Sequence, residues 1–295
     1  VTKTNFFSIC YGALTTIGLL TFISYATSYV LIENLAYERN QIGTIVGNLQ
    51  VVAEIALLCV FLPIGLLADK IGRRPVYSFG MFAMGLSYFL YPLATGIGEL
   101  TLYRVIYAIG MGCATGMLGT VTADYPQNHT RGKMIAVTGI LNATGVIFVS
   151  LVFARMPKNF ADMGFDQITA GKYAMWVVAG TCLITSIVVA FGLKKGTPTE
   201  EQKKIPYMEQ IKAGLAEGKN PRIKLAYAAA FVARSDLVIL GTFLILWGVT
   251  AGVDAGMSTS EATSVARLLF IISSMSALIA SPIIGYLIDK FDRIL

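Results

Sequence analysis

The sequence has little charge. Asp, Glu, Lys and Arg make up 14% of its 295 residues, while 55% are hydrophobic. Soluble globular domains carry about 25% charged residues, so a soluble enzyme or binding domain is excluded as the main class. The apolar residues gather in runs long enough to cross a hydrocarbon core of about 30 Å as helices. Because lipid offers the backbone no hydrogen bonds, we predict an all-α polytopic membrane protein.

Histidine and cysteine are also scarce. The single histidine, His129, lies between apolar runs, and the four cysteines lie inside them without the spacing of metal ligands. A thiol in an apolar run behaves as a small hydrophobic group. We therefore expect no disulfide, no metal and no cofactor. No nucleophile, metal or carboxylate constellation of an enzyme is visible in the sequence.

Eight apolar runs are separated by turn and charge signals. The predicted spans are 6–32, 42–67, 76–93, 100–123, 134–153, 173–193, 225–249 and 262–288. One connection is long, and it is rich in Lys and Glu. Because it divides the spans into six and two, we predict a six-helix domain at 1–193, a cytoplasmic linker at 194–224 and a second membrane domain at 225–295. The stretch 207–218 could form a short surface helix.

Basic residues predict the orientation, because short cytoplasmic loops collect Lys and Arg. With the N-terminus inside, 16 of the 23 Lys and Arg residues fall in inner segments and only four in outer loops. We therefore predict an integral protein of a cell or inner membrane with a cytoplasmic N-terminus. The net charge of +6 is spread over loops rather than along one stripe, which argues against nucleic-acid binding. We expect a monomer.

A motif occurs twice, after the second run and at the end of the eighth. The first copy is GLLADKIGRR and the second is GYLIDKFDR, at an offset of 220 residues. Their shared or signature positions are Gly65, Asp69, Gly72 and Arg73 in the first copy and Gly285, Asp289 and Arg293 in the second. A duplicated six-helix unit joined by the linker explains both copies.

The motif resembles the loop signature of the major facilitator superfamily, G-x-L-x-D-R/K-x-G-R-R/K, whose members have two six-helix halves. The stretch RVIYAIGMG from Arg104 is similar to the family element R-x-x-x-G-x-G, with Ala108 in place of the first Gly. The second motif copy departs from the family at Asp292. The resemblance implies the six-helix N-terminal half and the first two helices of the C-terminal half. We therefore expect a fragment with about eight of twelve helices, or alternatively a genuine eight-span protein; the subfamily is not assigned.

Ionisable side chains inside apolar runs are candidates for function, because an unpaired charge in hydrocarbon costs several kcal/mol. Glu54 shares one helical face with Gly43, Gly47 and Gln50. This face either lines a cavity in which Glu54 carries a proton, or packs closely while Glu54 bonds to a neighbouring helix. We treat Arg104 as distant from Glu54.

The other intramembrane charges also have two interpretations. Arg234 and Asp236 lie about 200° apart around a helix, so each needs a partner elsewhere, either in a central cavity or in an interhelical ion pair. Arg104 resembles the family arginine that is associated with the cavity and with proton coupling in some members. It could instead extend to lipid headgroups.

Polar residues on other runs suggest a substrate cavity and an inner gate. We place Thr21, Tyr25, Gln50 and Asn142 at the cavity, although tyrosines near a helix end are also ordinary interfacial residues. The resemblance implies that Arg73 pairs with Asp124, so that the two motif copies and Asp124 form an inner gate. The alternative is that the basic residues serve only to fix topology.

Together these patterns predict a secondary active transporter that moves a small solute by alternating access, coupled to protons. Its partners would be a small-molecule substrate, protons and the lipid bilayer. A membrane-embedded enzyme and a non-transporting membrane sensor with a transporter-like body are the alternatives.

Overall fold

The computed structural model describes residues 3–125, 131–194, 207–226 and 244–257, with short pieces between 228 and 286. The chain divides into two compact units, residues 1–203 and 204–295. The division falls inside the stretch that the sequence predicts to be a linker. The first unit holds the site described below.

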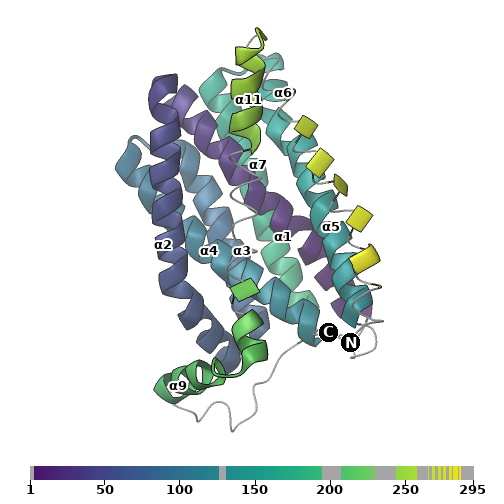
Figure 1. The fold of residues 1–295 in the computed structure, drawn as a ribbon. Helices are drawn as coiled ribbons and strands as arrows, with labels where there is room; N and C mark the ends of the chain where they lie inside the picture. The colour runs from purple at the N-terminus through teal and green to yellow at the C-terminus, as the bar shows by residue number, and fades with distance from the viewer. Residues whose placement is uncertain are drawn as a thin grey trace. The chain divides into compact units, whose positions relative to one another are not determined.

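The first unit is a bundle of long helices (Figure 1). Its helices are α1 (Lys3–Tyr29), α2 (Arg39–Ile71), α3 (Arg73–Leu90), α4 (Ile97–Asp124), α5 (Arg131–Leu151), α6 (Met156–Asp162) and α7 (Gln167–Gly192). Short helical turns at Val30–Asn34, Tyr91–Leu93 and Phe153–Arg155 extend three of them. In the described part of the chain, six helical segments are long and apolar enough to cross a membrane. They match the first six predicted spans and confirm the all-α membrane fold.

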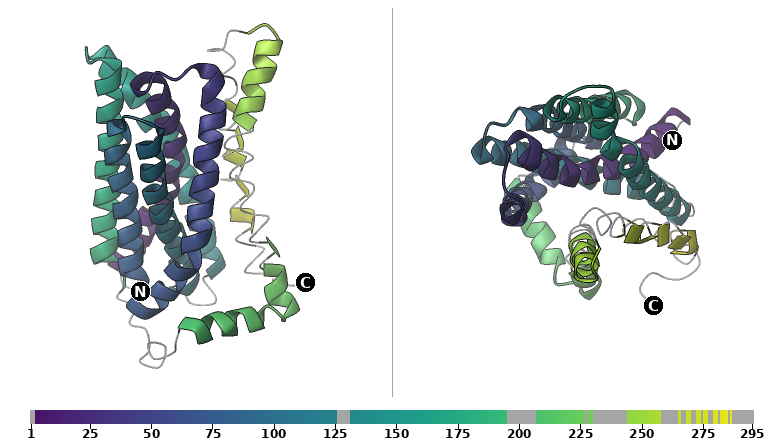
Figure 2. Two further views of the ribbon diagram at one scale, coloured as in Figure 1. Left: turned by 90° about the vertical axis from the view of Figure 1, so that its left-hand side faces the viewer. Right: turned by 90° about the horizontal axis from the view of Figure 1, so that it is seen from above.

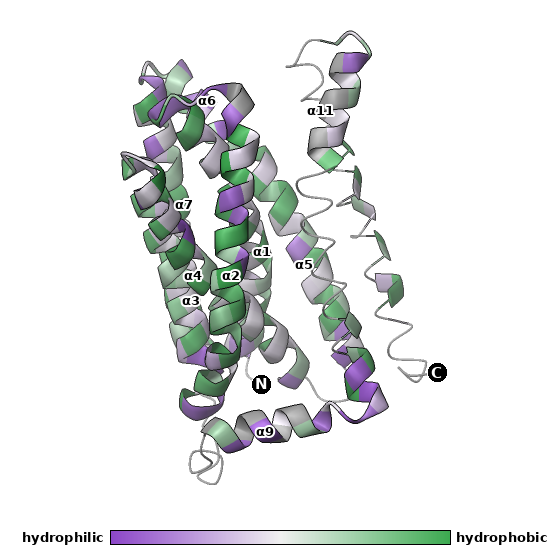
Figure 3. Ribbon diagram, turned by 60° about the vertical axis from the view of Figure 1, so that its left-hand side comes forward, coloured by the Kyte–Doolittle hydropathy of each residue, from purple (hydrophilic) through white to green (hydrophobic). Residues whose placement is uncertain are grey.

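The long helices of this unit run side by side, as the side and end views show (Figure 2). Hydrophobic residues cover most of their length, and hydrophilic residues gather at the connections and on α6 (Figure 3). This distribution is the one expected of helices that meet lipid along their middle and water at their ends. The stretch that forms α6 was predicted to be a loop. It is helical from Met156, and Pro157 suits one of the first two helical positions because its ring fixes φ.

The motif after the second span is not a loop, as its first seven residues continue α2 to Ile71. Gly65 and Asp69 are therefore on a helix. The turn is Gly72 alone, with φ at +94° and ψ at 159°, a conformation open essentially to glycine. Arg73 then begins α3. A single glycine thus reverses the chain between two spanning helices.

Glycines set how closely the helices of the first unit approach. A Cβ added at Gly18 of α1 would lie 2.6 Å from the carbonyl oxygen of Gly145 on α5, and one at Gly80 of α3 would lie 2.8 Å from that of Gly110 on α4. Backbones in direct contact are a common way to hold helices together in lipid, where apolar side chains gain little from leaving the solvent. These contacts fix α1, α3, α4 and α5 around the site.

A side-chain cap starts α7. The Asp166 carboxylate accepts a 3.0 Å hydrogen bond from the backbone N–H of Thr169. Hydrogen bonds from the side chain and the backbone of Thr169 hold the pKa of Asp166 below its usual value. An N-cap of this kind satisfies one of the four free N–H groups at a helix start.

The second unit contains α9 (Tyr207–Glu217) and α11 (Leu244–Asp254). α9 coincides with the short helix suggested at 207–218. α11 covers the end of the predicted span 225–249 and continues past it to Asp254. Most of the rest of that span and most of 262–288 lie outside the described residues, and so do Arg234, Asp236, Gly285, Asp289 and Arg293.

Candidate functional site: a polar network around Arg104

Arg104 of α4 is buried within the bundle, with 6% of its surface exposed. Its Nη2 donates a 2.6 Å hydrogen bond to Oε1 of Gln50 on α2. Its Nη1 donates a longer bond, 3.4 Å, to the hydroxyl of Thr27 on α1. The guanidinium also lies 5.3 Å from the ring centre of Tyr107, within the range of a cation–π contact. The side chain therefore points into the bundle and not toward headgroups.

Gln50 connects Arg104 to Glu54. Its Nε2 donates a 3.0 Å bond to Oε1 of Glu54, one helical turn further along α2. The treatment of Arg104 as distant from Glu54 was wrong, because α2 packs against α4 and one amide side chain contacts both groups. An amide can bridge a cation and a carboxylate, since its oxygen accepts while its nitrogen donates.

The network continues on the far side of Arg104. The Thr27 hydroxyl lies 3.1 Å from the hydroxyl of Tyr91 and donates a 2.7 Å bond to the backbone oxygen of Ile23. Arg104 Nε is buried and has no hydrogen-bond partner among the described residues. A buried N–H without an acceptor costs about 1–3 kcal/mol. One donor of the guanidinium therefore lacks an acceptor among the described residues.

Two buried tyrosines hold this region in place. The Tyr107 hydroxyl donates a 2.6 Å bond to the backbone oxygen of Leu20, and the Tyr88 hydroxyl donates a 2.5 Å bond to that of Leu19. Their rings meet edge to face with centres 5.8 Å apart. Both bonds join α1 to the pair α3 and α4, so the helices that carry Thr27 and Arg104 keep a fixed separation.

The four residues predicted to line the cavity do not gather at one point. Gln50 belongs to the network. The Thr21 hydroxyl bonds to the carbonyl of Gly18 on its own helix at 2.7 Å, and the Tyr25 hydroxyl lies 3.5 Å from that of Ser150 on α5. Asn142 on α5 has a buried Oδ1 without a partner among the described residues. Their assignment to a substrate cavity stays a prediction.

The glycines that precede Gln50 on the same face of α2 are exposed in the first unit. A Cβ added at Gly43 or Gly47 would meet no atom within 4 Å among the described residues. Close helix packing was one interpretation of this face. Among the described residues of the first unit, no helix packs closely against Gly43 or Gly47. Gln50 and Glu54 themselves are half-buried.

The end of the bundle near Gly72 carries the pair that the resemblance implies. Arg73 Nη1 lies 2.5 Å from Oδ2 of Asp124, which joins the start of α3 to the end of α4. Gly72 beside it is buried, while Gly65 and Asp69 on α2 are exposed. The pair is present, and its role as a gate stays a prediction.

Tyr125 extends this cluster to the end of α7. Its hydroxyl donates a 2.9 Å bond to the backbone oxygen of Lys194. Burial raises the pKa of Tyr125, and the nearby charges of Arg73 and Arg74 partly oppose that rise. The sequence analysis missed Tyr125, as it missed Thr27 and Tyr91. An arginine inside a span needs several hydrogen-bond acceptors on neighbouring helices, and this need could have pointed to a hydroxyl such as that of Thr27.

Comparison with known proteins agrees with this architecture. A family model described as Major Facilitator Superfamily matches residues 13–295. The magnetosome protein MamH of Paramagnetospirillum magneticum is 28% identical over 269 residues, which is 88% of this chain and 59% of the relative. The low affinity inorganic phosphate transporter 5 of Petunia hybrida is 33% identical over 116 residues, which is 37% of this chain and 22% of that protein. The chain thus spans less than two thirds of either relative.

A solved structure shares the fold. The proton:xylose symporter XylE, bound to 6-bromo-6-deoxy-D-glucose, superposes with a TM-score of 0.63 at 17% identity. The match covers 96% of this chain and 70% of that one.

Proposed function

Because the chain belongs to the Major Facilitator Superfamily, we propose that it forms part of a secondary active transporter that couples the movement of a small solute to protons. The observation that carries this proposal is the link from Glu54 through Gln50 to Arg104. It joins the intramembrane carboxyl group of Glu54 to the intramembrane cation of Arg104, whose Nε has no acceptor among the described residues. Intramembrane charges of this kind are candidates for proton relays and substrate binding.

The geometry suggests how a proton on Glu54 promotes solute binding. While Glu54 is ionised, its carboxylate accepts from Gln50 Nε2, and this charge-assisted bond keeps Oε1 of the amide directed at Arg104. A proton on Glu54 removes the charge and weakens that bond. Gln50 can then turn away, and the donors of Arg104 become available to a solute. On release, the solute would leave Arg104 first and the proton would leave Glu54 afterwards.

Alternating access requires that the two ends of the site open in turn. The Arg73–Asp124 pair lies at the end of the bundle that the charges predict to be cytoplasmic. We propose that it stabilises the state that is closed at this end. Opening would separate α3 from α4 at their loop ends and break the pair.

The available donors also bear on the solute. Arg104 offers N–H groups in a fixed fork, which suits a solute rich in acceptor oxygens, such as an oxyanion or a sugar. Two of the similar proteins are named as transporters of inorganic phosphate and of xylose. These two compounds are the first probes that we would use.

A membrane-embedded enzyme and a non-transporting sensor are the alternatives. An enzyme needs a nucleophile held by a base that is itself oriented by a third group. In the described network a cation donates to a neutral amide, an arrangement that suits binding more than bond cleavage. A sensor would bind solute without moving it, and a flux measurement separates it from a transporter.

Solute-driven proton movement tests the proposal. The protein at its full natural length would be placed in liposomes that contain a pH-sensitive dye, and a panel of solutes beginning with inorganic phosphate and xylose would be added outside. We expect at least one solute to change the internal pH in parent liposomes and to leave it unchanged with Arg104→Gln. The matched control is Lys133→Gln, which removes an exposed cation on α5. Binding of a solute without any proton or tracer flux would favour the sensor.

A further inference from the structure

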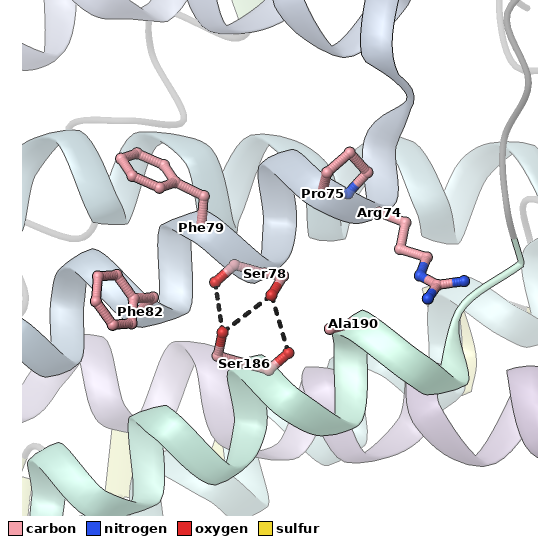
Figure 4. A pocket seen from close by; sticks show the side chains of 7 residues that line it. All are labelled: Arg74, Pro75, Ser78, Phe79, Phe82, Ser186 and Ala190. Atoms are coloured by element: carbon pink, nitrogen blue, oxygen red, sulfur yellow. Dashed lines mark hydrogen bonds between the residues drawn. The ribbon is translucent and has the colours of Figure 1, made fainter.

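A groove of about 490 Å³ lies between the first three turns of α3 and the last two turns of α7, apart from the network around Arg104 (Figure 4). Deeper in the bundle the same two helices are in close contact, because a Cβ on Gly85 would lie 3.0 Å from Cβ of Cys182. The same two helices also pack against others in the bundle, α3 against α4 and α7 against α1.

A pair of serines forms the floor of the groove. The Ser186 hydroxyl donates a 2.7 Å bond to the backbone oxygen of Ser78, the Ser78 hydroxyl donates a 3.1 Å bond to that of Ser186, and the two hydroxyls lie 3.0 Å apart. These reciprocal bonds hold α3 and α7 together at a fixed spacing (Figure 4). The groove is therefore a built feature of the helix pair.

Its outer wall is aromatic and faces the surface. Phe79 is 53% exposed and Phe82 is 47% exposed, and both rings stand on α3 beside the serines (Figure 4). Ile187 and Phe191 on α7 are also exposed. Large apolar side chains at the surface of a spanning helix are those that contact acyl chains. The groove therefore opens toward the hydrocarbon of the bilayer.

Arg74 lies at the loop end of the groove, near Ala190 (Figure 4). The preceding Arg73 is engaged with Asp124, and the first turn of α3 holds no acidic residue. A guanidinium can bond a phosphate with two parallel N–H groups. Basic pockets between spanning helices on the cytoplasmic side suit anionic headgroups, and this end is predicted to be cytoplasmic.

We propose that this groove binds one anionic phospholipid, with its phosphate on Arg74 and an acyl chain across Phe79 and Phe82. The inference rests on the order of these residues along α3. Arg74 lies at the end of the helix, where headgroups lie, and the rings of Phe79 and Phe82 lie one to two turns further into the span. The site depends on the membrane fold and not on the proposed transport. A bound lipid would bridge α3 and α7 beside the Arg73–Asp124 pair.

Native mass spectrometry of the detergent-purified full-length protein tests this site. Dioleoyl phosphatidylglycerol and dioleoyl phosphatidylcholine would be added separately, because they share acyl chains and differ in net charge. We expect the parent to retain phosphatidylglycerol preferentially. Arg74→Gln should weaken that binding by about tenfold or more, since a hydrogen bond to a charged group contributes about 1.5–3 kcal/mol.

Two further variants separate the groove from general charge attraction. Ala190→Trp keeps Arg74 but fills the space beside it, so it should also lower phosphatidylglycerol binding. Lys133→Gln removes an exposed cation elsewhere on the first unit and should leave binding unchanged. Equal retention of both lipids by the parent, or unchanged phosphatidylglycerol binding in Arg74→Gln, would overturn the proposal. An equal loss in Lys133→Gln would show diffuse charge attraction and would overturn it as well.

Discussion

Arg104 and Glu54, on different helices, are joined through one side chain: Gln50 accepts a 2.6 Å bond from the first and donates a 3.0 Å bond to the second. The carboxyl group and the cation therefore share one amide. Any change in the charge of one alters the hydrogen bonding of the other. This coupling is the physical basis of the proposed mechanism.

The bridge can be tested by removing the amide. Gln50→Leu keeps the approximate size of the side chain but leaves Arg104 without its shortest acceptor. We expect a loss of about 1–3 kcal/mol in stability, because a buried charged donor then lacks a partner. Thermal unfolding in detergent would measure it. Asn48→Leu, at an exposed position of the same helix, is the control; equal stability of the two variants would show that the bridge contributes nothing.

The Arg73–Asp124 pair should matter more for transport than for stability. Its side chains are 35% and 43% exposed, and exposed ion pairs contribute only about 0–1 kcal/mol. We expect Arg73→Asp and Asp124→Arg each to reduce the flux of whichever solute the parent carries, with little change in unfolding temperature.

The double exchange, Arg73→Asp with Asp124→Arg, restores opposite charges and should recover a substantial part of the flux. Lys133→Asp controls for a charge reversal elsewhere. A double variant as impaired as the single variants would contradict a gating role for the pair.

The contact between α1 and α5 should be intolerant of side chains. A Cβ on Gly145 would overlap the backbone of Leu14, so Gly145→Ala must push the helices apart. We expect a loss of about 1–3 kcal/mol, as for other overpacked contacts. Gly119→Ala is the matched control, since a Cβ there meets nothing within 4 Å among the described residues, and alanine favours a helix by about 1 kcal/mol. Similar unfolding temperatures for the two variants would exclude tight packing at Gly145.

The orientation can be tested by cysteine labelling in a background without the native cysteines. Lys133→Cys, at the start of α5, and Asp162→Cys, at the end of α6, are exposed and lie at opposite ends of the segment Arg131–Asp162. The loop charges predict labelling of the first only from the cytoplasm and of the second only from outside. The reverse pattern would invert the topology and move the Arg73–Asp124 pair to the outer side.

The sequence predicted the helices of the first unit well, because a run of apolar residues in lipid has few alternatives to a helix. It ended the second span at residue 67 and so left Asp69 outside the helix, whereas α2 continues to Ile71. The spacing of a motif does not show where a helix ends. Here α2 ends just before Gly72, whose positive φ does not continue a helix.

The candidate site was predicted residue by residue but not as a network. Helical periodicity placed Gln50 and Glu54 on one face of α2, and the family motif singled out Arg104. No periodicity within one helix gives the contact between α2 and α4, which depends on how the two helices pack. For the same reason Thr27 and Tyr91 could not be chosen over neighbouring hydroxyl groups.

The central claim is that Glu54 carries the coupled proton, and the most direct measurement compares accumulation with exchange in Glu54→Gln. Glutamine keeps the shape and the hydrogen-bonding capacity but cannot titrate. With the full-length protein in liposomes and the solute identified from the panel, we expect Glu54→Gln to exchange labelled solute at a rate near that of the parent. It should fail to accumulate the solute when a proton gradient is imposed. Gradient-driven accumulation that matches the parent would contradict the claim.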